Sequence, residues 1–363
     1  MEIAVLGGGH GCYAAAADAA EAGHNVRFWR RDTVAFRPIL ERSAIAVTDF
    51  RGQRDVTIAL ATTDIAEAMD GADLILSPLP GTAQRGLCET MAPHLKDGQV
   101  VFVPPGTMGS YLMAKQVLDS GNNADVCFGD AGTLPWLVRK QPDGVTRITT
   151  RAVRLPSGIF PAVHTDHAFA AIEQVFPAAE RCKDAMDAAL LNYGPIIHPP
   201  LILMNAGPLA HFDAWDIHNE GTQETIRNVH DALDAERIAI REALGYGEPH
   251  YRLADHYNRK EDGDLMYSLT SHDDLKDSSD WREDIDLFNH RYMLEDVAMG
   301  LAMMVSIGDW AGVPCPVAAG LLAVGGASVG QDFRATGRTL ENMGLADLNC
   351  DELQNLLKNG LNG

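Results

Sequence analysis

The first residues whose types and spacing indicate chemistry form a glycine-rich run near the start of the chain. The sequence opens MEIAVLGGGHGCYAAAADAAEAGHNVRFWRR, in which glycines surround His10. An apolar run precedes the glycines, an alanine-rich helical pattern follows them, and a second apolar run closes the unit. Strand, glycine turn, helix and strand within roughly 30 residues form the unit that binds dinucleotides. The unpaired N–H groups and the dipole at the start of such a helix favour a pyrophosphate.

Within this turn the glycines occupy positions with separate roles. Gly7 predicts the tight turn after the strand, and Gly9 lets the pyrophosphate approach the backbone. Cys12 stands where the third glycine of G-x-G-x-x-G is usual, and its small side chain still permits close packing of helix and strand. The predicted cofactor-binding turn therefore consists of Gly7, Gly8, Gly9, His10, Gly11 and Cys12.

The end of the second strand indicates which dinucleotide is bound. An NAD site usually carries an acidic residue there, which binds the ribose 2′-hydroxyl. This chain has Arg30 and Arg31 instead, and two guanidinium groups suit a 2′-phosphate. The alternative is a solvated basic pair, with Asp32 making the acidic contact. We favour NADP(H), with NAD(H) as the alternative cofactor.

The elements that must position this turn alternate between strand and helix over the first half of the chain. Expected strands cover residues 3–6, 26–29, 55–60, 73–77, 99–103 and 125–130. Strands rich in Val, Ile and Leu that alternate with helices predict a doubly wound parallel sheet, that is, an α/β Rossmann domain. Ligands bind beyond the carboxyl ends of such strands. Two loops are therefore expected over the ribose and nicotinamide, unless they are only proline-stiffened connections: Pro78, Leu79 and Pro80, then Pro105 and Gly106.

The second half of the chain has a different character. Long helical patterns cover residues 223–244, 291–310 and 316–324. We therefore expect two domains: an NADP(H)-binding Rossmann domain at 1–189 and an α-helical substrate and catalytic domain at 190–363. An acidic, poorly patterned stretch at 261–286 is expected to be a loop or lid.

His198 is the first candidate for acid–base chemistry in the helical half. It precedes a proline and an apolar helical pattern, which suggests a histidine at a helix N-terminus. The ordinary pKa of histidine lies close to neutral pH, so such a residue can donate and accept protons. A histidine that caps or packs is the alternative, and twelve other histidines compete with it, among them His211, His218 and His230.

A carboxylate that supports this histidine is expected on the late helix that begins near residue 291. Asp296 directly precedes an apolar run and is the candidate buried partner. Glu295 follows Arg291 by four residues, a spacing that suits a surface ion pair. Alternatively, Arg291 binds a substrate carboxylate in bidentate fashion. Both interpretations of Arg291 remain open.

The amino-acid composition argues against several classes of binding partner. The net charge of −21 over 363 residues makes nucleic acid and anionic membranes poor partners, and no apolar run is long enough for a membrane span. The six cysteines are scattered without metal-ligand spacing, so no metal site is predicted. Reduced thiols and the absence of a signal peptide suggest a cytoplasmic protein.

Several of these segments, in their order and spacing, resemble the octopine/nopaline-type opine dehydrogenases. The resemblance spans nearly the whole chain, and any one segment alone is weak. The matching segments are the glycine turn, Leu134-Pro135-Trp136 with Arg139, His198-Pro199 with Leu203-Met204-Asn205-Ala206, residues 234–240, Arg291-Tyr292 with Glu295-Asp296-Val297, Asp332-Phe333-Arg334 and residues 337–341.

The resemblance implies NAD(P)H-dependent condensation of an L-amino acid with an α-keto acid such as pyruvate, through an imine, in a cleft between the two domains. It makes His198 and Asp296 the catalytic pair, assigns the keto-acid carboxylate to Arg291, and includes Asn205 among the substrate-binding residues. Two other functions compete: a keto-substrate reductase similar to ketopantoate or glycerol-3-phosphate enzymes, and a non-catalytic NADP(H)-binding regulator. Such reductases usually need a catalytic lysine, and the helical half contains few. A monomer and a homodimer both remain open.

Overall fold

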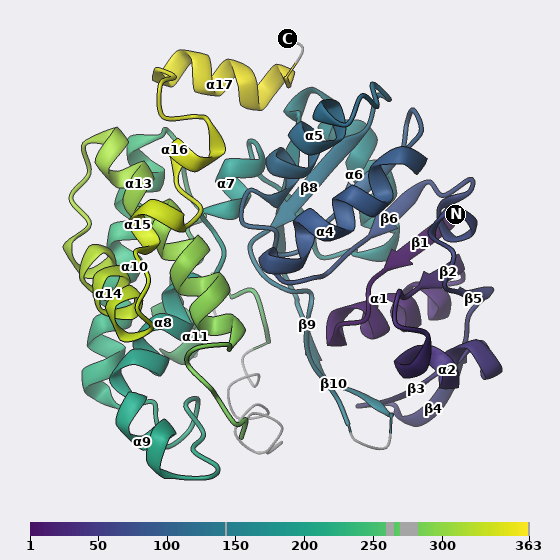
Figure 1. Ribbon diagram of the computed structural model, residues 1–363, viewed down its shortest axis with the longest axis horizontal. Helices are drawn as coiled ribbons and strands as arrows, with labels where there is room; N and C mark the ends of the chain where they lie inside the picture. The colour runs from purple at the N-terminus through teal and green to yellow at the C-terminus, as the bar shows by residue number, and fades with distance from the viewer. Residues whose placement is uncertain (142–143, 259–264, 269–281, 362–363) are drawn as a thin grey trace. The chain divides into compact units, whose positions relative to one another are not determined.

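The computed structural model describes residues 1–141, 144–258, 265–268 and 282–361. It comprises two compact units (Figure 1): Met1–Ala189 together with the residues from Leu356 onward, and Leu190–Asn355. The final residues therefore group with the first unit rather than with the helical half to which the sequence assigned them. Most of the expected acidic loop, 261–286, lies outside the described residues.

An eight-stranded sheet forms the centre of the first unit, in the order β12-β11-β8-β7-β6-β1-β2-β5. All its pairs are parallel except β11 with β8. The chain moves outward from β1 to β2 in one direction and later from β6 to β8 in the other. The strands are β1 (Glu2–Leu6), β2 (Asn25–Trp29), β5 (Leu60–Thr62), β6 (Leu74–Leu76), β7 (Val100–Phe102), β8 (Cys127–Ala131), β11 (Leu155–Phe160) and β12 (Ala179–Arg181).

Helices alternate with or follow these strands, because parallel neighbours cannot be joined by tight turns. They are α1 (His10–Glu21), α2 (Thr33–Arg42), α3 (Ile65–Met69), α4 (Gly81–Met91), α5 (Gly109–Asp119), α6 (Thr165–Val175) and α7 (Ala185–Ala189). The central strands β1, β6 and β7 are buried almost throughout, which explains their continuous apolar sequences. The predicted doubly wound sheet is confirmed.

A second sheet of four strands, in the order β4-β3-β10-β9, was not predicted. The single strand expected at 55–60 was wrong, because the chain there divides between the two sheets. Residues up to Thr57 pair antiparallel with β3 in a hairpin, and residues from Leu60 join the main sheet beside β2. The strands are β3 (Ala44–Asp49), β4 (Gly52–Thr57), β9 (Trp136–Lys140) and β10 (Thr146–Arg151).

Helix α1 lies between these two sheets. It contacts β1 and β2 on one side and all four strands of the second sheet on the other. Its run Ala14–Ala17, together with Ala19, is completely buried. Alanine suits this position because its small side chain lets both sheets approach the helix closely. The alanine-rich pattern therefore reflects burial on two sides rather than on one face.

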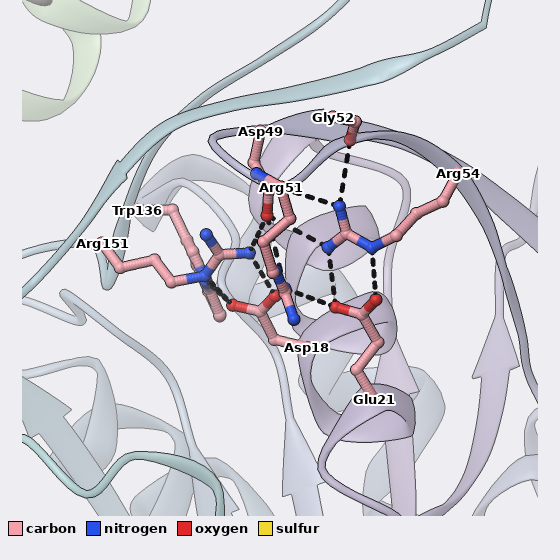
Figure 2. A network of polar contacts seen from close by, with 8 residues as sticks. All are labelled: Asp18, Glu21, Asp49, Arg51, Gly52, Arg54, Trp136 and Arg151. Carbon is pink, nitrogen blue, oxygen red and sulfur yellow. Dashed lines mark hydrogen bonds and ion pairs between the residues drawn. The ribbon is translucent and has the colours of Figure 1, made fainter.

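A network of charged groups ties the second sheet to α1; we call it the α1 clamp (Figure 2). Arg151 donates from Nε and Nη2 to the two oxygens of Asp18, each at 2.7 Å, and also to Asp49 at 2.8 Å. Arg54 binds Asp49 and Glu21. Burial alone would raise the pKa of Asp49, but hydrogen bonds from Arg54, Arg51 and Arg151 hold that pKa far below its usual range.

Trp136 of β9 joins the same network, because its Nε1–H donates to Asp18 Oδ2 at 2.7 Å. The indole is almost completely buried. The first residue of β9 is therefore fixed directly to α1, and so is the last residue of β10. The clamp sets the position of the β9–β10 pair on the helix that begins at the glycine turn.

The second unit is helical. Its main helices are α8 (Gly194–Met204), α9 (Ala206–His211), α10 (Glu224–Ala243), α11 (Leu253–Asn258), η3 (Tyr292–Leu301), α13 (Ala302–Ala311), α14 (Pro316–Ser328), α15 (Phe333–Thr336), α16 (Leu340–Met343) and the beginning of α17 (Cys350–Asn359). Together with the parallel sheet of the first unit, this confirms the predicted fold class. Among the described residues, no helix combines the length and apolarity that crossing a membrane requires.

Two expectations for this unit need correction. His198 is not at a helix N-terminus: α8 begins four residues earlier, at Gly194, and continues through Pro199 and Pro200. The prolines suggested a boundary, yet Pro199 and Pro200 both lie inside α8, beyond its first four residues, where each removes one backbone N–H donor. The single helix expected at 291–310 is a π-helix, η3, followed by the α-helix α13.

Candidate functional site

The four predicted cofactor segments follow four adjacent parallel strands. Along the sheet these strands are β2, β1, β6 and β7, and the chain leads from them into Arg30, the glycine turn, Pro78 and Pro105, respectively. The strand order changes direction between β1 and β6, and such a point opens a crevice at the carboxyl ends of the strands. The structure therefore brings these segments to one edge of the sheet.

The glycine turn has the conformation that its residues predict. Gly7 adopts φ +131°, which side chains other than hydrogen rarely permit, and Gly9 directly precedes α1. A Cβ on Gly7 would lie 2.8 Å from Leu79 Cδ2 and 2.9 Å from Cys12 Sγ. The loop after β6 thus packs directly on the turn. Cys12 is fully buried, and burial raises its pKa to about 12, so it is an inert packing group.

The other two predicted loops are also held in place. Pro80 precedes α4 as its N-cap residue, and a Cβ on Gly11 would lie 3.1 Å from Pro78. Gly106 adopts φ +84°, and a Cβ there would collide with the buried Asp130 carboxylate. Gln84 donates to the Gly106 carbonyl at 3.0 Å. Pro105 and Gly106 therefore belong to a rigid loop beyond β7.

Arg30 lies directly on the glycine turn, whereas Arg31 is exposed. A Cβ on Gly8 would be 2.5 Å from Arg30 Nε. Arg30 Nη1 donates to the Tyr13 hydroxyl at 3.0 Å. Asp32, the candidate for an NAD-type acidic contact, accepts the Ala35 N–H as the N-cap of α2 and lies 3.6 Å from Arg30. The guanidinium of Arg30 is therefore the charged group that lies against the glycine turn.

In the second unit, His198 and Asp296 form a close pair. His198 Nδ1 donates to Asp296 Oδ2 at 2.7 Å, although 98 positions separate the two residues. The His198 side chain is 13% exposed and that of Asp296 is 4% exposed. Tyr292 stacks on the imidazole, with ring centroids 3.8 Å apart at 19°. The carboxylate fixes the tautomer that carries hydrogen on Nδ1, and the tyrosine fixes the plane of the ring.

Two glycines permit this approach of α8 and η3. A Cβ on Gly194 would collide with Asp296 Oδ1, and a Cβ on Gly300 would collide with the ring of Pro195. Each helix thus contributes one glycine at the point where it meets the other. Tyr292 and Asp296, four residues apart on the π-helix η3, both contact His198.

Burial changes the protonation of the carboxylate in this pair. Burial raises the pKa of Asp296 to about 7, although the positive charges of Arg291 and His290 oppose the shift. Arg291 is 42% exposed, its Nη1 lies 3.9 Å from the buried Glu295, and its guanidinium carbon lies 4.7 Å from the Tyr292 ring centroid. A separation of 3.9 Å is too long for a hydrogen bond. An ion pair with Glu295 therefore explains little of the position of the Arg291 side chain.

The contacts of Asn205 are structural. Its Nδ2 donates to the carbonyls of Leu201 and Gly221 at 2.8 and 3.0 Å, and its Oδ1 accepts the Trp215 indole N–H at 3.0 Å. Both amide donors are used inside the protein. Asn205 therefore fastens the end of α8 to the segment before α10, and we do not include it in the proposed substrate site.

The competing histidines have different surroundings. Burial lowers the pKa of His230 to about 4, and its Nε2 lies 3.0 Å from the Ile197 carbonyl, so it is a neutral packing residue. His218 lies edge-on to His198, with ring centroids 5.8 Å apart. The His198 imidazole, by contrast, has its hydrogen bond to the buried Asp296 carboxylate. Tyr292 was missed as a member of the site, although it stands four residues before Asp296, on the same helix.

Comparisons with known proteins bear on both units. The sequence model of the NAD/NADP octopine/nopaline dehydrogenase α-helical domain matches residues 181–328. The model of the NAD-dependent glycerol-3-phosphate dehydrogenase N-terminus matches residues 2–107. An opine dehydrogenase from Arthrobacter sp. (strain 1C) is 27% identical over 350 residues, which cover 95% of each chain. The helical half of this chain therefore matches the octopine/nopaline dehydrogenase family, and an opine dehydrogenase aligns with nearly the whole chain.

The predicted resemblance to this family is thus confirmed, and the protein is an NAD(P)-dependent oxidoreductase acting on CH–NH groups. Solved structures agree on the fold. An octopine dehydrogenase in complex with NADH and agmatine has a TM-score of 0.72 at 19% identity, covering 98% of this chain and 97% of that one. An NADP⁺-bound yersinopine dehydrogenase has a TM-score of 0.62 at 15% identity, covering 99% and 98%. The glycerol-3-phosphate match ends within the dinucleotide unit and does not reach the helical unit.

Proposed function

We propose that this protein condenses an L-amino acid with an α-keto acid such as pyruvate and reduces the resulting imine with NADPH. The first unit would bind the cofactor and the second would carry the acid–base pair. The observation that carries the proposal is the buried hydrogen bond between His198 and Asp296, which lies within the helical unit typical of the family.

The amine of the amino acid attacks the keto carbon, and water then leaves to give an imine. His198 exchanges protons with the carbonyl and hydroxyl oxygen during these steps. Because Nδ1 is bonded to Asp296, this exchange takes place at Nε2. Asp296 keeps the ring in the correct tautomer and stabilises its charged form. A bound nicotinamide cofactor supplies the hydride that reduces the imine carbon.

Arg291 is assigned to the carboxylate of the keto acid. Its guanidinium is partly exposed, lies against the tyrosine that stacks on His198, and donates no hydrogen bond to any of the described residues. A planar guanidinium binds a carboxylate through two parallel hydrogen bonds. These features support a role in holding the keto acid next to the acid–base pair.

The proposal also specifies NADP(H) rather than NAD(H). Arg30 lies against Gly8 at the end of β2, where the adenosine ribose is bound in this fold. Asp32 uses one carboxylate oxygen to cap α2, which makes it a poor ligand for two ribose hydroxyls. A cation without a competing free acid favours the 2′-phosphate.

The test is a matrix of α-keto acids and L-amino acids in which the oxidation of NADPH is followed for each pair. We expect oxidation that requires both an amine and a keto acid, with a secondary amine as product by mass spectrometry. Oxidation by a keto acid alone, at a rate independent of added amine, would instead support a reductase of the ketopantoate class. NADH in place of NADPH in the same matrix tests the cofactor assignment.

A further inference from the structure

Lys140, a residue that the family resemblance does not single out, ends its strand at the glycine turn. It is the last residue of β9, in the second sheet. Its backbone N–H donates to His10 Nδ1 at 2.6 Å, and His10 is the first residue of α1. Because Nδ1 accepts this bond, the ring hydrogen of neutral His10 is on Nε2. A strand outside the Rossmann sheet therefore reaches the pyrophosphate-binding end of α1.

The ammonium group of Lys140 lies over the same tyrosine that Arg30 contacts. Lys140 Nζ is 4.9 Å from the centroid of the Tyr13 ring, a cation–π distance, while Arg30 Nη1 donates to the Tyr13 hydroxyl at 3.0 Å. Tyr13 is almost completely buried. One buried aromatic side chain thus contacts two cations that come from different sheets.

These two cations repel one another. Burial lowers the pKa of Lys140, and the charge of Arg30 lowers it further, with only Asp32 opposing. No ion pair of Lys140 occurs within the described parts of the chain, and the ion pair of Arg30 there is the 3.6 Å contact with Asp32. A doubly charged phosphate between the two groups would relieve this repulsion and form charge-assisted hydrogen bonds with both.

We infer that Lys140 is a second ligand of the 2′-phosphate of NADP(H), opposite Arg30, and thereby determines cofactor specificity. The inference rests on the proposed preference for NADP(H). It adds that the specificity site is shared between the Rossmann sheet and the second sheet. Arg31, which is exposed, is not part of this site.

The α1 clamp fixes β9 to α1. This explains how Lys140, a residue of the second sheet, is held accurately enough to bind the 2′-phosphate. Trp136, at the start of β9, is bonded to Asp18 of α1, and Arg151 of β10 pairs directly with Trp136 in the sheet and binds Asp18 as well. Strand β9 is thus fixed to α1 near its first residue, through the clamp, and at its last residue, through His10.

The experiment compares binding of NADP⁺ and NAD⁺ by isothermal titration calorimetry at one fixed ionic strength. The variants are Lys140→Gln, Lys140→Arg and Arg30→Gln, with Lys115→Gln as the matched control, because Lys115 pairs with Asp119 on the surface of α5. Circular dichroism melts check that each variant is folded. Losing one charge-assisted contact should weaken NADP⁺ binding roughly tenfold in Lys140→Gln, and NAD⁺ binding should change less than about twofold. Lys140→Arg should restore most of the affinity for NADP⁺.

The outcomes separate this inference from the proposal on which it rests. If the unaltered protein prefers NADP⁺ and Lys140→Gln keeps that preference while Arg30→Gln loses it, Lys140 is not a ligand and the cofactor proposal stands. If the unaltered protein binds NAD⁺ as tightly as NADP⁺, both are wrong. An equal loss of both nucleotides in Lys140→Gln would also contradict the inference, because it would indicate a damaged glycine turn rather than a lost phosphate contact.

Discussion

The cofactor edge of the first unit and the acid–base pair of the second are built on different principles. The cofactor edge consists of short segments that each follow a strand, and its geometry comes from the backbone of neighbouring strands. The acid–base pair consists of two side chains from distant parts of the chain, and its geometry comes from the close contact of α8 with η3.

This difference indicates how each site should respond to substitution. A backbone site tolerates a changed side chain, as Cys12 in place of glycine illustrates. A side-chain pair depends on each of its atoms and on the small residues that let the helices meet. Substitutions in the helical unit should therefore abolish turnover without affecting cofactor binding, whereas substitutions at the strand ends should change cofactor choice.

The largest effect is expected from Asp296→Asn. The amide cannot stabilise the charged imidazole and can favour the wrong tautomer, so turnover of amine plus keto acid should fall by roughly 10³-fold. Steady-state rates measure this, and fluorescence titration should give an unchanged dissociation constant for NADPH. Asp309→Asn, an exposed carboxylate on α13, is the control. Near-normal turnover by Asp296→Asn would remove Asp296 from the catalytic pair.

A smaller loss is expected when the helix contact is widened. In Gly194→Ala the new methyl group displaces the Asp296 carboxylate, and we expect turnover to fall on the order of 10²-fold through misalignment. Gly207→Ala, on α9, is the matched control because a Cβ there meets nothing within 4 Å. Equal activities of the two variants would show that the close contact of α8 and η3 is not needed.

At the strand ends, Arg30→Gln should act on cofactor choice. We expect the ratio of the NADPH to NADH dissociation constants to rise roughly tenfold, because a charge-assisted contact with the 2′-phosphate is lost. Competitive titration of both cofactors measures the ratio. An unchanged ratio would mean that Arg30 does not read the 2′-phosphate.

The smallest predicted effect is on stability. The pKa of Asp296 rises from 3.8 to about 7 on folding, so the folded chain binds this proton more tightly than the unfolded chain does. The free energy of unfolding therefore falls as the pH rises through that interval. Asp296→Asn lacks this loss and should therefore be more stable at pH 8, by on the order of 1 kcal/mol, but not at pH 4.

Thermal melts of both proteins at the two pH values measure this difference. A gap that is the same at pH 4 and pH 8 would contradict the raised pKa. A stabilised but inactive variant would show that the catalytic carboxylate is retained against its cost in stability.

The cofactor edge could be predicted from the sequence because each of its segments directly follows an apolar strand. Lys140 could not, since β9 belongs to a sheet whose strands come from separate parts of the chain. The polar, alternating residues 52–57 that form one edge of that sheet do not resemble a parallel strand. Their position depends on ion pairs such as Arg54 with Asp49, which no local pattern reveals.

For the acid–base pair, the residue types predicted which side chains take part, whereas the expected helix boundaries did not predict where they lie. His198 and Asp296 could be selected by chemistry and by the family resemblance. The prolines after His198 suggested a helix start where the helix interior lies. The spacing of four residues places Tyr292 and Asp296 on one face of a helix, but their contact with His198 depends on packing against α8, which no local pattern reveals. The family resemblance selected Asn205, but its amide is used in structural contacts.

The most direct test of the account measures both functions of one variant, His198→Ala. We predict that it binds NADPH as the unaltered protein does, while oxidation of NADPH by an amino acid plus a keto acid falls by roughly 10³-fold. His211→Ala, an exposed histidine at the end of α9, should keep full activity. Undiminished turnover by His198→Ala, with normal NADPH binding, would contradict the central claim that this histidine carries the chemistry.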